Sequence, residues 1–435
     1  MKEQRAIKNA AWIIGCKLIK AILTLVVTML TARYLGPSNY GTINYAAGLV
    51  AFFTPLMKLG LGAIQVYALV DRPEEEGKIV GTTTVLNAIS ALLCIVGIVA
   101  FAAVANANEP ETILVCGIYS FLLLFQAFEM IQYWFQAKLL SKYSSIAMLL
   151  AYVVAAVFQT VLLIADKNVY WFAASGSMEF AVISVILLLI YRRKGGAPLA
   201  FSWEEAKRLL SMGKFYILPE MMVVIFAQTD RIMLKLMLDS EAVGIYSAAV
   251  TCATMFGFVY AAIIDSSRPG IFESHKQSRD EFEKNVIALY SIIFYLSIVV
   301  CVAICLFAPL IIAIMYGDGY ASAVTPLKIV VWYTTFSLFG SVRNIWLLAE
   351  GKQMYLWRIN LWGAVANVLL NGLLIPNWGA SGAAFASLIT QAFTNVIVGF
   401  ILKPVRRNNY LLFQGMDIRI LLSNAKGLLR LRNDK

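Results

Sequence analysis

The sequence alternates between long apolar runs and short polar segments over its whole length. An apolar run of about 20 residues is long enough to cross the hydrocarbon core of a bilayer as a helix. Reading the runs in this way predicts twelve membrane-spanning helices. They cover residues 10–33, 42–70, 79–105, 112–137, 143–165, 169–191, 215–238, 243–267, 286–316, 321–349, 359–375 and 380–402.

The composition agrees with a chain that lies almost entirely in the membrane. Of its 435 residues, 60% are hydrophobic and only 14% are charged, and the mean hydropathy is +0.75. No window is polar enough to form a separate aqueous domain. The net charge of +11 would suggest nucleic acid in a soluble protein, but membrane topology explains it first, so no nucleic-acid partner is expected.

The residues that build disulfide frameworks and metal sites are scarce. All six cysteines lie inside apolar runs, and the one histidine, His275, lies in a polar stretch, so neither a disulfide framework nor a metal site is expected. The segment before Cys16 imitates the cleavage box of a bacterial lipoprotein. Its apolar run is shorter than a signal-peptide core and continues past Cys16 to Ala32, which favours an uncleaved first helix.

The loops between the predicted helices alternate in charge. Of the 36 Lys and Arg residues, 27 fall in the N-terminus, the tail and the loops of the same side. The opposite loops hold Lys167, with Arg33 at a helix end beside them. Because basic loops resist translocation, we predict a multi-pass membrane protein with both termini in the cytoplasm.

The longest internal connection, residues 192–214, divides the predicted helices into two sets of six. The predicted domains are an N-lobe over 1–191, a cytoplasmic linker over 192–214, a C-lobe over 215–402 and a basic cytoplasmic tail over 403–435. Ser202 to Glu205 match a capping box, so the linker is predicted to carry an amphipathic helix that ends near Gly213. The tail is predicted to form a helix on anionic lipid, with a solvated tail as the alternative.

An internal repeat supports the two lobes. The segments 35–47 and 238–249 each place a glycine six residues after their first leucine, at Gly41 and Gly244. Since each half holds an even number of helices, both halves start on the same side of the membrane. The predicted fold is therefore an all-α polytopic membrane protein, with twelve transmembrane helices in two parallel-repeat six-helix lobes around a central cavity.

No catalytic or energy-coupling motif is present. The sequence lacks a phosphate-binding loop, a His-Glu-x-x-His zinc motif and a Gly-x-Ser-x-Gly nucleophile motif. The predicted outward loops are also too short to form a catalytic domain. The sequence therefore predicts a membrane transporter and not an enzyme, without a cofactor, driven by a gradient or by a partner.

Charged residues inside the predicted helices carry the main functional signal, because each costs on the order of 2.5–3.5 kcal/mol at a helix centre. Lys17 and Lys20 share one face of the first helix, and Arg231 and Lys235 share one face of the seventh. Seven bases against five acids leave a surplus that favours a phosphate or pyrophosphate. The candidate residues for an anionic headgroup are Lys17, Lys20, Lys58, Arg231, Lys235 and Arg33. In the alternative, each base pairs with a carboxylate and joins two helices.

Three acids inside the helices are candidates for ion coupling or for pairing: Glu179, Glu129 and Asp230. Three roles stay open for Glu179, which are a protonated structural group, a partner of Lys20 or Lys58, and a proton relay. Asp230 is favoured as an ion-pair partner because it adjoins Arg231. Coupling to H⁺ or Na⁺ is therefore an open prediction.

Three segments, 32–41, 229–249 and 374–384, resemble one family of membrane proteins. In this order and spacing they are similar to the Wzx-type polysaccharide-biosynthesis flippases of the multidrug/oligosaccharidyl-lipid/polysaccharide exporter superfamily. The resemblance covers nearly the full chain. It implies two six-helix lobes in a V that alternate access, and a cargo of undecaprenyl-pyrophosphate-linked oligosaccharide moved to the outer leaflet.

The resemblance also implies that the first, second, seventh and eighth helices line the cavity, which favours the basic residues above over Lys328 and Arg343. Extra C-terminal helices of the peptidoglycan-precursor branch are missing, so that cargo is not expected. Expected partners are membrane lipids, and a polysaccharide polymerase and glycosyltransferases of the same pathway, with the transporter itself a monomer. The alternative function is a cation-coupled multidrug (MATE-like) exporter, which should have an acidic cavity.

Overall fold

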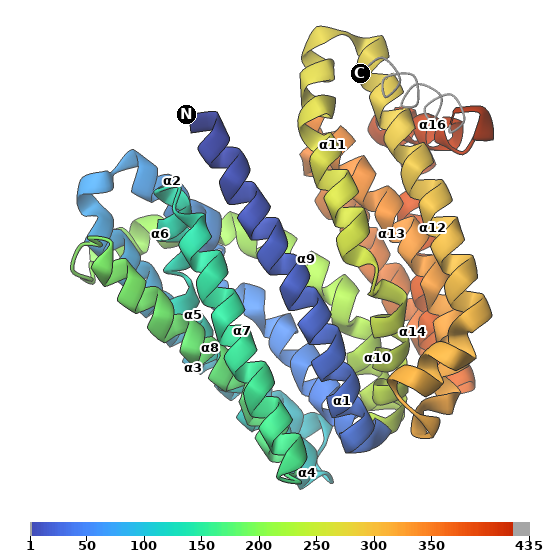
Figure 1. The fold of residues 1–435 in the computed structure, drawn as a ribbon, viewed down its shortest axis with the longest axis horizontal. Coiled ribbons are helices and arrows are strands. Elements are labelled where there is room, and N and C mark those ends of the chain that lie inside the picture. The colour runs from blue at the N-terminus through green and yellow to red at the C-terminus, as the bar shows by residue number, and fades with distance from the viewer. Residues whose placement is uncertain (1, 421–435) are drawn as a thin grey trace. The chain divides into compact units, whose positions relative to one another are not determined.

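The computed structural model describes residues 2–420, and among these it leaves out the side chains of residues 2–14 and 16–18. The described part of the chain is helical and contains no strand. It forms two compact units, of which the first ends at Gly244 and the second begins at Ile245 (Figure 1). The predicted division into lobes at the linker 192–214 stays a prediction.

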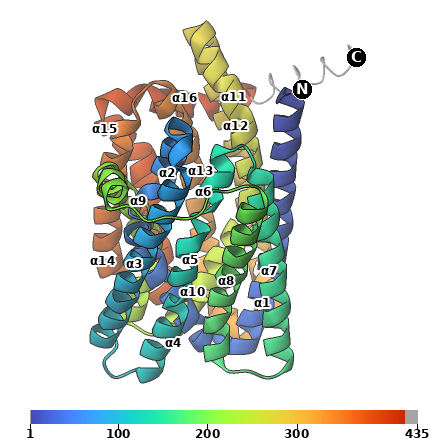
Figure 2. The same cartoon turned by 90° about the vertical axis from the view of Figure 1, so that its left-hand side faces the viewer.

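The first unit contains nine helices and the start of a tenth. They are α1 (Lys2–Lys58), α2 (Leu61–Asp71), α3 (Glu76–Ala105), α4 (Pro110–Ser120), α5 (Leu122–Glu129), α6 (Gln132–Ala137), α7 (Ser141–Ile164), α8 (Val169–Arg193) and α9 (Trp203–Met237), with a 3-10 turn over Pro73–Glu75. The hairpin of α7 and α8 packs side by side, and α1 packs against α7 and α9 (Figure 2). Trp134 packs edge to face on Phe135 and Tyr191 in the apolar core.

The helix α1 joins two predicted spans without a loop. Gly36 has a φ of 72° and is followed by Pro37, so the chain changes direction at one residue. Glycine adopts positive φ without a steric penalty, and proline suits the first turn of the helix that follows. Gly379, with a φ of 54°, divides α14 in the same way. The connections between the predicted spans 10–33 and 42–70, and between 359–375 and 380–402, are therefore kinks within helical segments.

The predicted span 112–137 is broken twice, into α4, α5 and α6. The breaks lie at Phe121 and at Met130–Ile131. Glu129 is consequently the last residue of α5, next to the second break. The Glu129 carboxylate of the candidate site is therefore located at the end of a helix.

The segment that leads into α9 lies along α3. The Ala200 amide donates to the Gly77 carbonyl at 3.1 Å, and the Ser202 amide donates to the Thr82 hydroxyl at 3.0 Å. The Ser202 hydroxyl then accepts from the Glu205 amide at 3.4 Å, which confirms the predicted helix cap. The helix continues to Met237, so the predicted amphipathic segment and the seventh span form one helix, α9.

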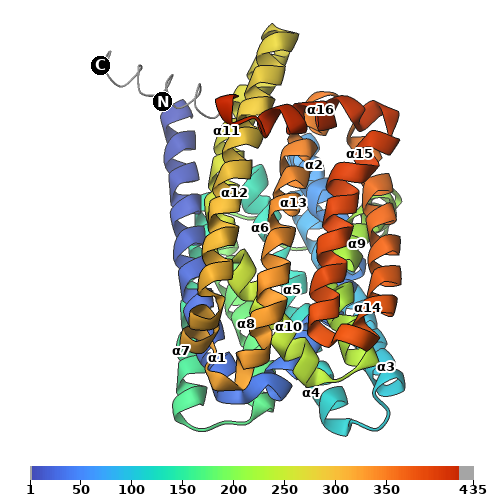
Figure 3. The same ribbon diagram turned by 90° about the vertical axis from the view of Figure 1, so that its right-hand side faces the viewer.

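The second unit contains the rest of α10 and six further helices. They are α10 (Ser240–Thr254), α11 (Gly257–Gln277), α12 (Arg279–Met315), α13 (Val324–Ala349), α14 (Leu356–Ala392), α15 (Val398–Ile401) and α16 (Arg406–Gly415), with 3-10 turns over Asp318–Ala323, Gln353–Tyr355 and Lys403–Val405 and a π turn over Phe393–Ile397. The helices α12, α13 and α14 stand side by side, and α16 lies across their ends (Figure 3). Of the predicted basic tail, residues 421–435 lie outside the described residues.

Eight of the described helical segments are long and apolar enough to cross a membrane, or nine when the pair α10 and α11, bent by 45°, is taken as one span. Two of them, α1 with α2 and α14 with its extension, each contain two predicted spans around a glycine kink. The more polar α13, which carries Lys328 and Arg343, accounts for the remaining predicted span. The predicted all-α polytopic fold is confirmed.

Candidate substrate-binding site

Lys20 of α1 and Glu179 of α8 form an ion pair inside the first unit. The Lys20 Nζ lies 3.0 Å from the Glu179 Oε1, and the two side chains are 42% and 18% exposed. The same Nζ lies 5.0 Å from the centre of the Tyr152 ring on α7, within the range of a cation–π contact. Of the roles left open for Glu179, the structure therefore shows that of a partner of Lys20.

Glu129 of α5 is influenced by two of the predicted basic residues. It is half-buried, and the positive charges of Lys58 and Lys20 both act on its carboxylate, that of Lys58 more strongly. Gln126 and Gln132, three residues before and after it, contribute hydrogen bonds. Residues three apart on a helix share a face. The Glu129 carboxylate thus interacts electrostatically with both Lys20 and Lys58.

Lys58, the last residue of α1, has no direct partner in the described part of the chain: no hydrogen bond or ion pair reaches its ammonium group. Its charge acts at longer range on Glu129 and on Glu220 of α9. The side chain is half-buried. A lysine at membrane depth requires water or an anion as its counterpart. Lys58 is therefore the basic residue of this region that is most available to a phosphate oxygen.

Arg231 of α9 belongs to the same region. Its guanidinium donates to the Gln228 Oε1 at 2.8 Å. Its Cβ lies next to α1, because a Cβ added at Gly48 would be 3.8 Å from it. The charges of Arg231 and Glu179 both act on the Tyr119 hydroxyl of α4. Arg231 and the Lys20–Glu179 pair consequently face one polar interior.

These side chains form what we call the interior charge cluster. Its charged members are Lys20, Lys58, Arg231, Glu129, Glu179 and Glu220. Three bases face three acids, so the cluster is close to neutral. The predicted surplus of positive charge stays a prediction, because the sequence count covered all the predicted helices and did not identify neighbours. Asp230, beside Arg231, is also buried, with 4% of its surface exposed.

Two other predicted headgroup residues, Lys235 and Arg33, lie outside the cluster. The Lys235 Nζ lies 2.5 Å from the Glu109 Oε2, and its side chain is only 2% exposed. This hydrogen bond, with a second from Thr112, lowers the pKa of the Glu109 carboxyl. Arg33 is exposed on α1, and the side chain of Lys17 is not among those described. Lys235 is therefore paired and is a weaker candidate for substrate contact than Lys58.

A further ion pair, between Arg72 and Glu205, holds the start of α9 and could not be predicted from the sequence. The Arg72 guanidinium donates to both carboxylate oxygens of Glu205, at 2.7 and 2.8 Å. This arrangement raises the pKa of Arg72. Glu205 was recognisable only as part of a capping box, since its partner lies 133 residues away. For Glu129, the flanking Gln126 and Gln132 were a usable signal, because their spacing marks a polar helix face.

The sequence is similar to that of membrane proteins from two organisms. A candidate O-antigen transporter of Shigella flexneri is 21% identical over 402 residues, which cover 87% of this chain and 93% of that protein. A membrane protein of Methanocaldococcus jannaschii is 23% identical over 225 residues, which cover 49% of this chain and 44% of that protein.

Two solved transporter structures share the fold. The lipid II flippase MurJ, in an inward closed conformation, matches with a TM-score of 0.70 at 14% identity and covers 95% of this chain and 92% of that chain. An inward-facing multidrug resistance MATE family transporter of the MOP superfamily matches with a TM-score of 0.67 at 16% identity. The match covers 90% of this chain and 95% of that chain. These likenesses concern the fold alone.

The sequence pattern of the family described as polysaccharide biosynthesis protein matches residues 6–275. This range is more than half of the chain and includes the whole interior charge cluster. It also includes two of the three segments, 32–41 and 229–249, that carried the resemblance to Wzx-type flippases. The chain belongs to the polysaccharide biosynthesis protein family.

Proposed function

We propose that the protein flips a polyprenyl-pyrophosphate-linked oligosaccharide, the repeat unit of a surface polysaccharide, across the bacterial cytoplasmic membrane. The polyprenyl tail stays in lipid while the headgroup passes through the polar interior. A charged headgroup cannot cross hydrocarbon unaided, because the cost of burying its charge is too high. The observation that carries the proposal is Lys58, a half-buried ammonium group without a direct carboxylate partner in the described residues.

The near-neutral cluster suggests how the headgroup binds and leaves. Lys58 binds a phosphate oxygen first, because it has no partner to release. Lys20 then exchanges Glu179 for a second oxygen, since lysine donors form strong charge-assisted hydrogen bonds to phosphate. When the headgroup leaves, the Lys20–Glu179 pair closes again, and no unpaired charge stays buried. The loaded and empty states thus differ in contacts, which is the requirement for alternating access.

Glu129 is the proposed coupling residue. When Glu129 is ionised, its negative charge attracts the ammonium groups of Lys58 and Lys20. When Glu129 is neutral, both ammonium groups are available to the anionic headgroup. A proton bound at Glu129 would therefore favour headgroup binding. Na⁺ bound at the same carboxylate would likewise neutralise it and favour headgroup binding. The proposal therefore covers coupling to either H⁺ or Na⁺.

The proposed orientation places both termini in the cytoplasm. In the first unit, the turn after α2 carries Arg72 and the end of α8 carries Arg192 and Arg193. The opposite turn, between α7 and α8, carries Lys167. This asymmetry supports a cytoplasmic location of the more basic end. A monomer that receives its cargo from glycosyltransferases and delivers it to a polymerase agrees with this direction of transport.

A multidrug exporter is the second candidate, because Glu129, Glu179 and Glu220 offer three carboxylates to a cationic drug. The two candidates differ in the residue that transport requires. Cationic drugs need the carboxylates and would be repelled by Lys58, whereas a pyrophosphate needs Lys58.

The test is flipping of undecaprenyl-pyrophosphate-linked oligosaccharide by the purified full chain in proteoliposomes. Lys58→Ala should slow flipping by about ten- to hundredfold, since a charge-assisted hydrogen bond is lost, and Lys58→Arg should retain most of the rate. Lys78→Ala, at an exposed position of α3, is the matched control. Undiminished flipping by a folded Lys58→Ala protein would overturn the proposed headgroup site. Drug transport without lipid flipping would favour the exporter.

A further inference from the structure

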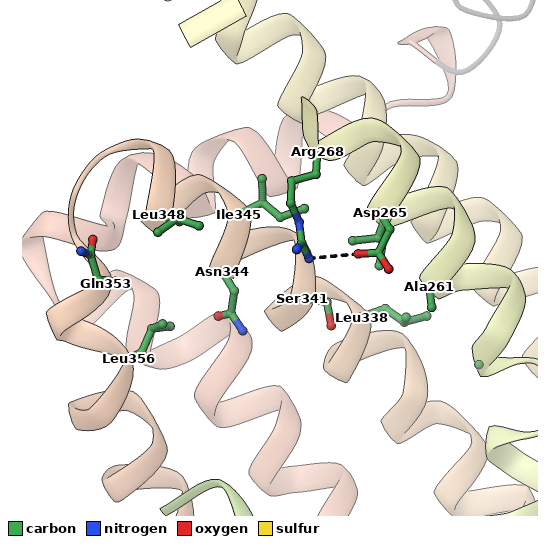
Figure 4. A pocket seen from close by; sticks show the side chains of 12 residues that line it. Ala261, Asp265, Arg268, Leu338, Ser341, Asn344, Ile345, Leu348, Gln353 and Leu356 are labelled. Atoms are coloured by element: carbon green, nitrogen blue, oxygen red, sulfur yellow. Dashed lines mark ion pairs between the residues drawn. The ribbon is translucent and has the colours of Figure 1, made fainter. Parts of the chain in front are cut away.

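A pocket of about 490 Å³ opens within the second unit between α11 and α13 (Figure 4). Asp265 and Arg268 line it from α11, Ser341 and Asn344 from α13, and Gln353 from the turn before α14. Leucine and isoleucine side chains from α11, α13 and α14 form the apolar part of the wall. Its volume lies within the range of about 300–1,000 Å³ that is usual for small-ligand pockets.

The charged pair in this pocket indicates contact with water. The Arg268 guanidinium lies 3.0 Å from the Asp265 carboxylate, and the two side chains are 49% and 65% exposed. Both lie on α11, which belongs to a bent helix pair that is apolar enough to cross the membrane. They lie at the end of the predicted span 243–267, and their exposure places both charged groups in contact with water. The pocket is therefore open to aqueous ligands.

The charges of the pocket cancel. Asp265 and Arg268 are its only charged lining residues, and they pair with each other. A pyrophosphate gains little from such a site, because the guanidinium is already neutralised. The Asp265–Arg268 ion pair does not weaken the binding of a neutral ligand that forms hydrogen bonds. The electrostatics thus favour an uncharged polar group.

Two side-chain amides in the pocket are available to a ligand. The side-chain amides of Asn344 and Gln353 form no hydrogen bond with any other described residue. The Ser341 hydroxyl donates only a long bond of 3.4 Å, to the Ser337 carbonyl. Amides, a hydroxyl and a carboxylate together supply both hydrogen-bond donors and acceptors. This mixture matches the hydroxyl groups of a sugar, and the apolar wall matches the C–H face of its ring.

We propose that this pocket binds a sugar residue of the transported headgroup, apart from the residues that bind its pyrophosphate. The inference rests on the proposed function, since it assumes a lipid-linked oligosaccharide as cargo. Within the second unit, the sugar hydroxyls would bind to Asn344, Gln353 and their neighbours.

The experiment measures binding to the purified full chain in detergent. The probes are synthetic undecaprenyl pyrophosphate without sugar and the lipid-linked oligosaccharide extracted from the source organism. The double variant Asn344→Ala, Gln353→Ala removes two amides without a structural partner, so it should fold. It should bind the oligosaccharide-bearing lipid about tenfold more weakly, the effect of one or two lost hydrogen bonds. Its affinity for the sugar-free lipid should be unchanged.

Ser266→Ala is the matched control, because Ser266 is an exposed residue of α11 that does not line the pocket. Equal affinity of the double variant and the unaltered protein for the oligosaccharide-bearing lipid would overturn the sugar site. An equal loss for both lipids would also overturn it, because it would indicate a general defect. If the unaltered protein binds neither lipid, the proposed function itself fails, and this result is distinct from the other two.

Discussion

Gly41 and Gly244 pack backbone against backbone in the first unit. A Cβ added at Gly41 would lie 1.6 Å from the Ser240 carbonyl oxygen and 2.8 Å from the Gly244 amide nitrogen. A Cβ added at Gly244 would lie 2.0 Å from the Pro37 carbonyl oxygen. Both glycines occupy the same position in the two copies of the sequence repeat. The repeat thus marks the place where its two copies meet.

Gly41→Ala should therefore destabilise the protein strongly. Overpacking of a tight interior costs about 1–3 kcal/mol, and here the nearest obstacle is backbone, which cannot rotate away. The melting temperature of the full chain in detergent is the measurement. Gly372→Ala is the control, because its added Cβ meets nothing within 4 Å; in a helix interior it should leave stability equal or about 1 kcal/mol higher. A Gly41→Ala protein as stable as this control would contradict the close packing.

The fold was largely predictable from the sequence. Hydropathy alone located the helical spans, because the bilayer fixes the length of an apolar helix. The kinks had a local signal as well, since Gly36 is followed by Pro37 and Gly379 follows Pro376 within a few residues. The breaks around α5 had no such signal, because Phe121 and Met130 are ordinary helix residues whose local geometry depends on packing.

The site was predictable only in part. The cost of intramembrane charge identified Lys20, Lys58, Glu129, Glu179 and Arg231 one by one. Their pairing depended on tertiary structure, since Lys20 and its partner are 159 residues apart. The count of bases and acids predicted a positive interior, but it could not identify which carboxylate lies near each base.

The Lys20–Glu179 pair should show strong coupling in a double-mutant cycle. Removing either group leaves the other charged at membrane depth, so Lys20→Ala and Glu179→Ala should each lower stability. The double variant removes both charges and should lose less than the sum of the two single changes. Thermal unfolding of all four proteins in detergent gives the coupling. Additive effects would show that the pair contributes nothing beyond its separate side chains.

The Glu109–Lys235 pair should make stability depend on pH. The hydrogen bond from Lys235 lowers the pKa of Glu109 from its ordinary value of 4.5 in the folded protein. A carboxyl with a lowered folded pKa stabilises above its unfolded pKa, and this contribution disappears as pH falls through the folded pKa. Because Glu109 is 49% exposed, solvent screening keeps the contribution modest.

Glu109→Gln tests this dependence. At neutral pH the variant leaves the buried Lys235 without its carboxylate, so it should melt below the unaltered protein. The two melting temperatures should converge in acid, below the pKa of Glu109, because the unaltered carboxyl is then neutral as well. Glu111→Gln, at an exposed position two residues away, controls for the loss of a surface charge. A constant difference between Glu109→Gln and the unaltered protein at every pH would contradict the assignment.

Glu129→Gln should make the rate of flipping independent of the proton gradient. The amide keeps the size of the side chain but holds no negative charge, so Lys58 and Lys20 stay available to the headgroup in every state. In proteoliposomes with lipid-linked oligosaccharide, an imposed pH gradient should accelerate the unaltered protein several-fold and leave Glu129→Gln unaffected. Glu220→Gln is the matched control, since that carboxylate senses Lys58 alone and should preserve the response. A full gradient response in Glu129→Gln would assign coupling to another residue, whereas a response to Na⁺ and not to pH in the unaltered protein would identify the other ion.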